Sequence, residues 1–407
     1  MDVHQVTEWD AKLGGLVVFR GILGNPLIEK FRALLSAAAG YDGRPAPLVA
    51  AASAFEAALL PIGEDWGAVL LDILLEDDNL CIRRAAAGGA GEVAEACLAR
   101  ELALLQRIGA LTLPDLVGGL PDADRLLQQM LPPSWKAQTQ NYTAAYLSRC
   151  AEVGRKGFGM FARCHVFTLE DGRLTPVRYP DPQRLSQLPG YERERQKVID
   201  NTKALLAGKP AANVLLYGDA GTGKSSTVKA IANEFAAEGL RLVEIKKHQL
   251  YQLPALMDEL AQNPLKFILF IDDLSFSSND DNFAALKAIL EGSVGGRSHN
   301  VAVYATSNRR HLVKERMSDR TGDDLHEGDA RQELMSLSAR FGLTVTFQQP
   351  DKARFDAILL DLAKQYGLQM PADQLYLRGE AFALRAGGRS PRVAKQFVEL
   401  AAAGVGV

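Results

Sequence analysis

The spacing of hydrophobic residues changes along this chain, and the changes divide it into segments. In residues 1–155, apolar side chains recur at intervals of three and four, as in AEACLARELALLQRIGALT (94–112), and Gly- and Pro-rich breaks separate the runs. This spacing places apolar residues on one face of a helix, so we expect a mostly helical N-terminal domain over residues 1–155. The apolar stripes are interpreted first as core faces and second as surfaces for a partner.

Residues 156–189 follow a different pattern. The stretches FGMFARCHVFTL and LTPVRY flank EDGR, whose Asp-Gly pair is typical of a tight turn between two strands. A proline-marked stretch, YPDPQRLSQLPG, comes next. We therefore expect a short β-hairpin and a rigid linker over residues 156–189.

From residue 190 onward, short apolar runs alternate with helical patterns. The expected strands cover 213–217, 240–245, 267–271, 300–305 and 343–347. Strands that are apolar throughout and separated by helices are typical of a parallel sheet covered on both faces. The pattern predicts an α/β fold, with a nucleotide-binding type of core over 190–349 and a helical lid over 350–407.

Composition narrows the class of protein. The chain has 407 residues, of which 47% are hydrophobic and 23% are charged, and its formal net charge is -3. These values are ordinary for a globular protein, and the chain lacks the basic surplus usual in proteins that bind nucleic acid through bulk electrostatics. The sequence shows no signal pattern and no membrane-spanning run, so we expect a cytoplasmic protein. The four cysteines are dispersed, without metal-binding spacing.

The clearest chemical signal is YGDAGTGKSST at residues 217–227, which has the spacing G-x-x-x-x-G-K-[ST]. Backbone N–H groups of such a loop, together with the N-terminus of the next helix, form a cradle for phosphates. Lys224 is expected to reach the β- and γ-phosphates, and the Ser225 hydroxyl to bind Mg²⁺. The predicted nucleotide-binding residues of the loop are Gly218, Asp219, Ala220, Gly221, Thr222, Gly223, Lys224, Ser225 and Ser226.

Polar residues end two of the later strands. FILFIDDLSF places Asp272 and Asp273 directly after one apolar strand, and VAVYATSNRR places Asn308 after the next. We expect Asp272 to bind Mg²⁺ and Asp273 to act as the base or to orient the attacking water. Asn308 is expected to hydrogen-bond the γ-phosphate or that water.

This order of loop, Asp-ended strand and Asn-ended strand resembles the AAA+ ATPases, with Asn308 at sensor 1. SLSARFGLTVTF is similar to the segment that carries the arginine finger, which makes Arg340 the candidate, and GGRSPRVAKQF is similar to sensor 2, with Arg392 as its arginine. Both segments are similar to the motor of Holliday-junction branch migration. DDLSF and YATSNRRHL are shared with a bacterial family of uncharacterised AAA+ ATP-binding proteins. The resemblance covers about residues 158–400.

The resemblance implies an ATPase that uses ATP and Mg²⁺ and assembles into a homo-oligomer, with a hexamer favoured. We further expect this ATPase to remodel or regulate an unknown protein client that binds the N-terminal domain. Two points stay open. Many AAA+ motors have Glu where this chain has the shorter Asp273, so slow hydrolysis is expected. Arg320, in the charged segment RRHLVKERMSDRTGDDLHEGDARQE, competes with Arg340 as the arginine that acts on a neighbouring subunit.

Two other functions have some support in the sequence. A nucleic-acid-associated ATPase, such as a helicase loader or branch-migration motor, is supported by the arginine-finger and sensor 2 likeness and by the arginines between residues 309 and 320. The net acidity and the lack of a DNA-reading module argue against it. A small-molecule kinase is less favoured because Asn308 and the helical tail with Arg392 are not features of that class.

Overall fold

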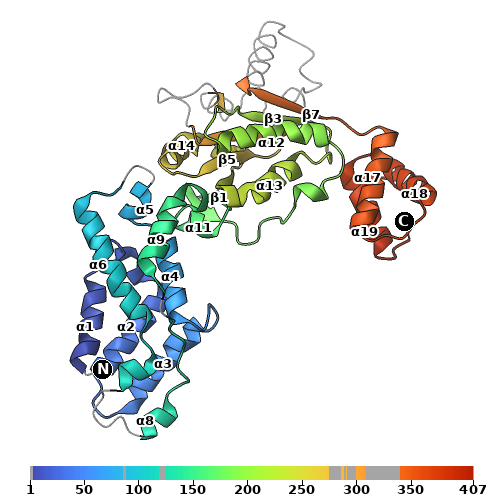
Figure 1. Cartoon of the computed structure of the whole chain (residues 1–407). Helices are drawn as coiled ribbons and strands as arrows, with labels where there is room; N and C mark the ends of the chain where they lie inside the picture. The colour runs from blue at the N-terminus through green and yellow to red at the C-terminus, as the bar shows by residue number, and fades with distance from the viewer. Residues whose placement is uncertain are drawn as a thin grey trace. The chain divides into compact units, whose positions relative to one another are not determined.

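The computed structural model describes residues 3–85, 89–118, 125–138, 140–274, 286–287, 290, 299–308 and 340–406. The chain divides into two compact units, Met1–Arg163 and Cys164–Val407 (Figure 1). The division falls before the predicted hairpin, at Arg163, whereas the sequence pattern suggested a separate linker segment from residue 156 to residue 189. Within the described part of the chain, every helix is too short or too polar to traverse a lipid bilayer.

The first unit is built of helices, as its apolar spacing predicts. Side chains at helix starts bind free backbone N–H groups: Asn25 caps α2, Asp65 caps α4 and Asn141 caps α9. Buried aromatic rings of three helices meet in its core, where Phe31 stacks on Trp66 at 4.8 Å between ring centroids. The helices are α1 (Val3–Gly14), α2 (Pro26–Ala39), α3 (Pro45–Leu59), α4 (Trp66–Glu76), α5 (Leu80–Ala85), α6 (Glu92–Gly109), α7 (Leu113–Val117), α8 (Arg125–Met130), α9 (Tyr142–Ala151), α10 (Val153–Lys156) and α11 (Met160–Arg163), with a 3₁₀ turn η1 (Arg20–Gly24).

A seven-stranded sheet forms the centre of the second unit. Its spatial order is β2-β1-β4-β5-β6-β3-β7, and every neighbouring pair is parallel except β1 with β2. The predicted α/β fold with a parallel sheet is thus confirmed. The strands are β1 (Val166–Glu170), β2 (Arg173–Pro176), β3 (Val214–Gly218), β4 (Leu240–Glu244), β5 (Lys266–Ile271), β6 (Val301–Ser307) and β7 (Leu343–Phe347).

The predicted hairpin exists, but it extends this sheet and does not form a separate connector. Its first strand, β1, pairs in parallel with β4, with Val166 opposite Leu242. Alternate β1 side chains, Phe167 and Leu169, are fully buried. The hairpin therefore covers the edge of β4 that would otherwise expose unpaired backbone groups.

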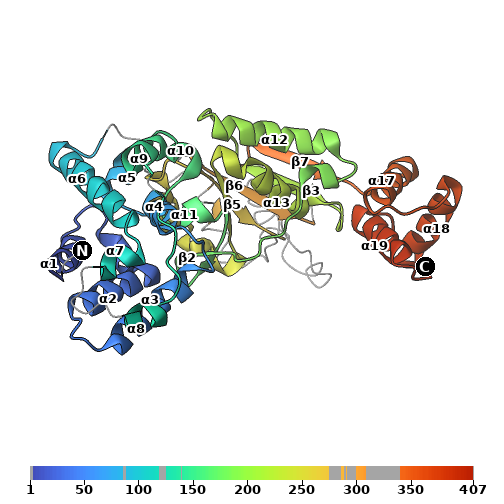
Figure 2. The ribbon, with the colours of Figure 1, turned by 60° about the horizontal axis from the view of Figure 1, so that its bottom comes forward.

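Helices α12 (Glu192–Leu206), α13 (Lys224–Phe235) and α14 (Leu253–Ala261) pack on the sheet, and β7 leads into a group of three helices (Figure 2). These are α17 (Lys352–Gln365), α18 (Ala372–Arg385) and α19 (Pro391–Ala402). One apolar core runs from the sheet into this helical lid, since Val345, Phe355 and Phe397 belong to the same buried cluster. The remaining short turns are η2 (Leu185–Gln187), η3 (Ala236–Glu238) and η4 (Lys247–Gln252).

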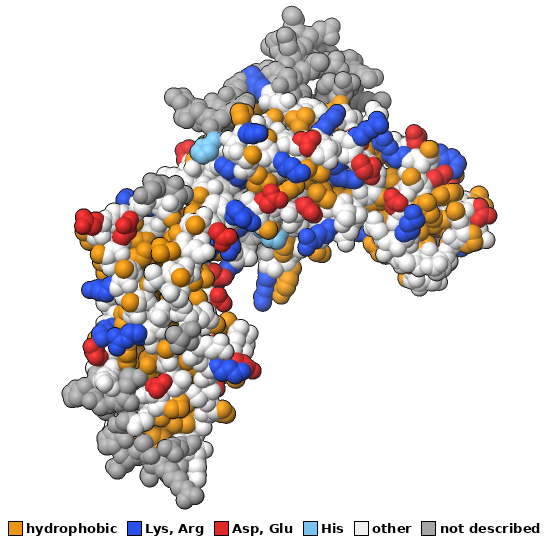
Figure 3. All heavy atoms as spheres, viewed as in Figure 1, with side chains coloured by type: hydrophobic (Ala, Val, Ile, Leu, Met, Phe, Trp, Pro, Cys, Tyr) orange, Lys and Arg blue, Asp and Glu red, His pale blue; other side chains and the backbone are white. Residues whose placement is uncertain are grey.

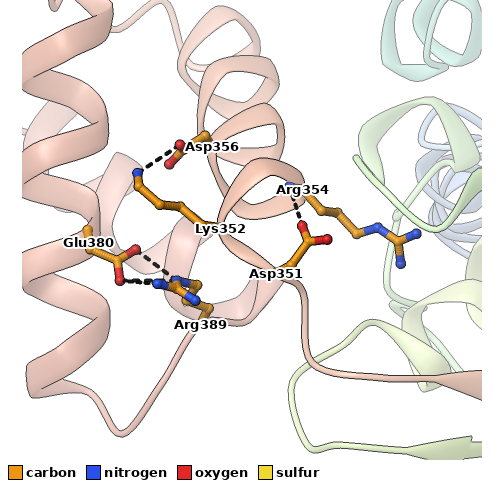
Figure 4. A network of polar contacts seen from close by, with 6 residues as sticks. All are labelled: Asp351, Lys352, Arg354, Asp356, Glu380 and Arg389. Carbon is orange, nitrogen blue, oxygen red and sulfur yellow. Dashed lines mark hydrogen bonds and ion pairs between the residues drawn. The ribbon is translucent and has the colours of Figure 1, made fainter.

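Polar contacts fix the start of the lid. The Asp351 carboxylate accepts the backbone N–H of Arg354 at 2.8 Å and so caps α17. Arg389, from the segment between α18 and α19, binds both carboxylate oxygens of Glu380 on α18, at 2.6 to 3.0 Å (Figure 4). The planar guanidinium matches the carboxylate in this two-pronged pair, which holds the segment before α19 in place.

Candidate functional site

The phosphate-binding loop lies between the end of β3 and the first residue of α13. Gly218 has φ +134°, and a Cβ at this position would lie 2.0 Å from the Phe347 carbonyl oxygen of β7. Only glycine fits there, because the loop passes directly against a neighbouring strand. Gly223 has φ +92° with open space around it, so the loop leaves room beside its backbone just before α13 begins.

Lys224 lies under this loop and is buried, with only 6% of the residue exposed. Its Nζ donates hydrogen bonds to the Gly218 carbonyl (2.9 Å), the Asp219 carbonyl (2.7 Å) and Asn308 Oδ1 (3.0 Å). Burial lowers the pKa of Lys224, although nearby carboxylates oppose the change. An ammonium group held only by neutral oxygens fits a site that accepts phosphate.

The Asp272 carboxylate, at the end of β5, accepts hydrogen bonds from two hydroxyl groups. Ser225 Oγ, from the first turn of α13, donates to Asp272 Oδ1 at 2.6 Å. Thr306 Oγ1, from the end of β6, donates to the same atom at 2.5 Å. Mg²⁺ prefers a small set of carboxylate and hydroxyl oxygens, so Ser225 and Asp272 form a donor set that fits it.

Asp273 adopts a left-handed backbone conformation, with φ +50°. Thr306 holds it there: Thr306 Oγ1 accepts the Asp273 N–H at 2.9 Å, and the Thr306 carbonyl accepts the Leu274 N–H at 2.7 Å. Asp273 Oδ1 in turn accepts the Asn308 amide N–H at 2.9 Å. Left-handed conformations of non-glycine residues cost energy and are concentrated at functional sites, where neighbouring contacts enforce them.

Asn308 therefore links Lys224 to Asp273. Its Oδ1 accepts from Lys224 and its Nδ2 donates to Asp273, so its amide orientation is fixed from both sides. Thr306 is the functional candidate that sequence reasoning missed. The sequence gives no signal of the two hydrogen bonds that its hydroxyl makes.

These groups line one end of a cavity of about 850 Å³. The cavity is also lined by the segment that precedes α12 and by the lid helix α17. Sequence reasoning also missed these residues, apart from the proline pattern that indicated a rigid connector. They are Asp181, Pro182, Gln183, Gln187, Leu188, Pro189, Leu362, Gln365 and Tyr366.

The two predicted arginines occupy different places. The Arg392 N–H donates to the Gly221 carbonyl at 3.1 Å, and the residue lines the cavity together with Lys395. Arg340 lies just before β7, whose first residue Leu343 is opposite Val214, the first residue of β3. Arg340 is thus near the amino end of the sheet, whereas the loop follows the carboxyl end of β3. Arg309, Arg310, Arg316 and Arg320 lie outside the described residues.

Asp219 connects the loop to the segment that leads into the lid. Its Oδ2 accepts the Gln349 N–H at 2.6 Å, and its own N–H donates to the Phe347 carbonyl at 3.0 Å. Gln349 stands two residues before Asp351, the N-cap of α17. Sequence reasoning placed Asp219 among the nucleotide-binding residues; in the structure its carboxylate binds this segment.

Two known proteins are similar to parts of this chain. One relative, the replication factor C large subunit of Thermofilum pendens, is 29% identical over 119 residues. That match covers 27% of this chain, and the chain spans about a quarter of the relative's length. Among solved structures, the Holliday junction branch migration motor RuvB of Thermotoga maritima matches 55% of this chain and 67% of its own, with 16% identity and a TM-score of 0.37.

The family match covers more of the chain than the curated relative does. It begins just before β1 and continues through α19, so it takes in the whole sheet, the phosphate-binding loop and the lid. The chain belongs to the family described as "Protein of unknown function (DUF815)", whose model matches residues 162–405.

Proposed function

We propose that this protein binds ATP with Mg²⁺ in the cavity beside α13 and hydrolyses it to ADP and phosphate, and that turnover remodels or regulates a partner. The observation that carries the proposal is the hydrogen-bonded group formed by Lys224, Asn308, Asp273, Asp272 and Ser225. The ends of β5 and β6 and the start of α13 bring these side chains to one part of the cavity. Transfer of a phosphoryl group to water needs a cation that binds the phosphates, ligands that hold the metal, and an acid that faces the attacking water. Lys224 is suited to the first role, Ser225 and Asp272 to the second, and Asp273 to the third.

Each residue has a proposed role. Lys224 exchanges its loop carbonyls for the β- and γ-phosphates, and Ser225 and Asp272 hold the metal. Mg²⁺, when bound, neutralises charge that develops on the phosphates. Asp273 accepts the proton of the attacking water, while Asn308 fixes Asp273 by its amide N–H. Arg392 contributes a positive charge from the lid side.

The short side chain of Asp273 supports slow hydrolysis. Asp lacks one methylene of Glu, and one Asp273 oxygen is already engaged by Asn308 at 2.9 Å. Water must therefore meet the other oxygen, close to the sheet. A protein with this arrangement acts more as a nucleotide-dependent switch than as a fast motor.

The place of Arg340 supports action on a neighbouring subunit. The five residues of β7 separate it from the loop side of the sheet, a distance of about 17 Å at the rise of a strand. An arginine there serves the nucleotide of another copy better than its own. We therefore propose a homo-oligomer, with a hexamer favoured, and a client that binds the separately packed first unit.

The test is ATP binding by calorimetry, together with phosphate release, for the wild-type chain and for Lys224→Ala. We expect the wild type to bind ATP and release phosphate, and the variant to lose binding. Lys209→Ala is the matched control, because it removes an exposed lysine that does not line the cavity, and it should bind ATP and release phosphate like the wild type.

A nucleic-acid-associated ATPase is the second candidate. One observation favours it: the segment shared with a replication factor C large subunit. On the face seen in Figure 3, however, Lys and Arg side chains are interspersed with Asp and Glu over the described part of the second unit. Stimulation of phosphate release by duplex or single-stranded DNA would favour this candidate, and a rate unchanged by DNA would argue against it.

A further inference from the structure

The helix that begins at the phosphate-binding loop also holds a second part of the cavity wall, residues 181–189. Asn233 lies in α13, nine residues after Lys224. Its Nδ2 donates two hydrogen bonds, to the Asp181 carbonyl and to the Gln183 carbonyl, both at 2.8 Å. Asp181 and Gln183 line the same cavity as the loop, and nine helical residues place Asn233 about 13 Å along α13 from Lys224.

A histidine directly before β1 fixes the orientation of the Asn233 side-chain amide. His165 Nε2 lies 2.8 Å from Asn233 Oδ1. Because the Asn233 amide nitrogen already donates to two carbonyls, its oxygen must accept, so His165 carries a proton on Nε2. The His165 carbonyl accepts the Leu242 N–H of β4 at 2.8 Å, which anchors the histidine to the sheet.

The wall segment has few other supports within the sheet. It contains Pro182 and Pro189, whose missing N–H groups cannot join a backbone ladder. Its other described hydrogen bonds join residues of the segment itself, such as the Arg184 N–H to Gln187 Oε1 at 2.8 Å, while Leu185 packs against the apolar core of the second unit. Among the described side chains, Asn233 supplies the hydrogen bonds that tie the backbone of this segment to the helix that begins at the phosphate-binding loop.

We propose that Asn233, oriented by His165, is a positioning residue that sets the wall against which the base of the nucleotide packs, and so contributes to base selectivity. The inference rests on the proposed function, since the phosphates must occupy the loop end for the base to reach this wall. Asn233 acts through residues 181–189 and touches neither the phosphates nor the metal.

The experiment compares ATP, GTP and inorganic tripolyphosphate binding to the wild-type chain, Asn233→Ala and Asn233→Asp. Asn233→Asp keeps the shape and the oxygen that faces His165 but replaces both N–H donors by an acceptor. Loss of two hydrogen bonds should weaken ATP binding by about 10-fold in Asn233→Ala, and by at least as much in Asn233→Asp. Tripolyphosphate has no base, so its affinity should stay at the wild-type value in both variants. The ratio of the affinities for ATP and GTP should move closer to one in both variants than in the wild type.

Glu234→Ala is the matched control, because it changes an exposed neighbour on the same helix and should leave all three affinities unchanged. A wild-type chain that fails to bind ATP would contradict the proposed function itself. If the wild type binds ATP but both Asn233 variants bind it equally well, the positioning role is wrong. Equal losses for ATP and tripolyphosphate would also overturn it, since they would show general damage to the fold.

Discussion

Replacing Thr306 by valine removes one hydroxyl from the centre of the site while it preserves the side-chain shape. Thr306 is buried, with 2% of the residue exposed, and its Oγ1 donates to Asp272 at 2.5 Å and accepts the Asp273 N–H at 2.9 Å. Thr306→Val loses both bonds. The carboxylate keeps its bond from Ser225, so the change disturbs the site without removing an acid.

The expected magnitudes follow from these contacts. A hydrogen bond to a charged group contributes about 1.5–3 kcal/mol and a neutral one about 1 kcal/mol, and the remaining partners of Asp272 place the net loss near the lower end, at about 2 kcal/mol. The left-handed Asp273 backbone also loses its side-chain anchor. Misplacing a water-activating acid should slow hydrolysis by roughly 10- to 100-fold, within the range that general base catalysis supplies.

Urea unfolding and single-turnover phosphate release measure the two effects separately. Thr306→Ser keeps the hydroxyl and is the matched control, with stability and rate expected close to those of the wild type. ATP affinity should change little in Thr306→Val, because Lys224 and the loop are untouched. If Thr306→Val hydrolyses ATP as fast as Thr306→Ser does, the Thr306 hydroxyl does not position Asp273 and the reasoning is refuted.

Four further predictions concern neighbouring groups. Asp273→Asn should keep ATP and Mg²⁺ binding but slow phosphate release, and normal turnover would remove Asp273 from its role. Asp219→Ala should speed the dissociation of a fluorescent ADP analogue, because the lid loses its tie to the loop; Asp219→Asn, which keeps an acceptor oxygen, should restore the wild-type rate. Arg340→Ala should lower turnover by about 10³-fold while it preserves ATP binding, and mixing it with Lys224→Ala should restore part of the activity; a concentration-independent rate from a monomer would contradict this. Burial lowers the pKa of Lys224 below its value in the unfolded chain. Between these two pKa values the unfolded chain binds more protons than the folded protein, so the free energy of unfolding of the nucleotide-free protein should rise as pH increases toward about 10.4. Urea titrations at several pH values measure this gain, which should be smaller in Lys224→Met.

The residues that the sequence placed in the site share one property: each is defined by its position next to a strand. Lys224, Asp272 and Asn308 follow apolar strands, and parallel strands bring their carboxyl ends to the same edge. Local pattern was therefore enough to predict that they meet. Their roles toward ATP and Mg²⁺ stay predictions.

What the sequence could not predict depends on contacts between distant segments. The pairing of β1 with β4 joins Val166 to Leu242, and the wall of the cavity depends on Asn233, some 50 residues from Asp181 and Gln183. Such contacts leave no local spacing or composition signal, because a hairpin in a linker and a hairpin on a sheet edge have the same alternation of side chains.

The most direct test of ATP hydrolysis in this cavity is a product assay with γ-labelled ATP and Mg²⁺ on the purified full chain. The account predicts that the wild type releases ADP and inorganic phosphate in equal amounts, that EDTA stops the release, and that Lys224→Ala releases none because the loop has lost its buried cation. Phosphate release by Lys224→Ala at the wild-type rate, or no ATP binding by the wild type at millimolar ATP, would contradict it.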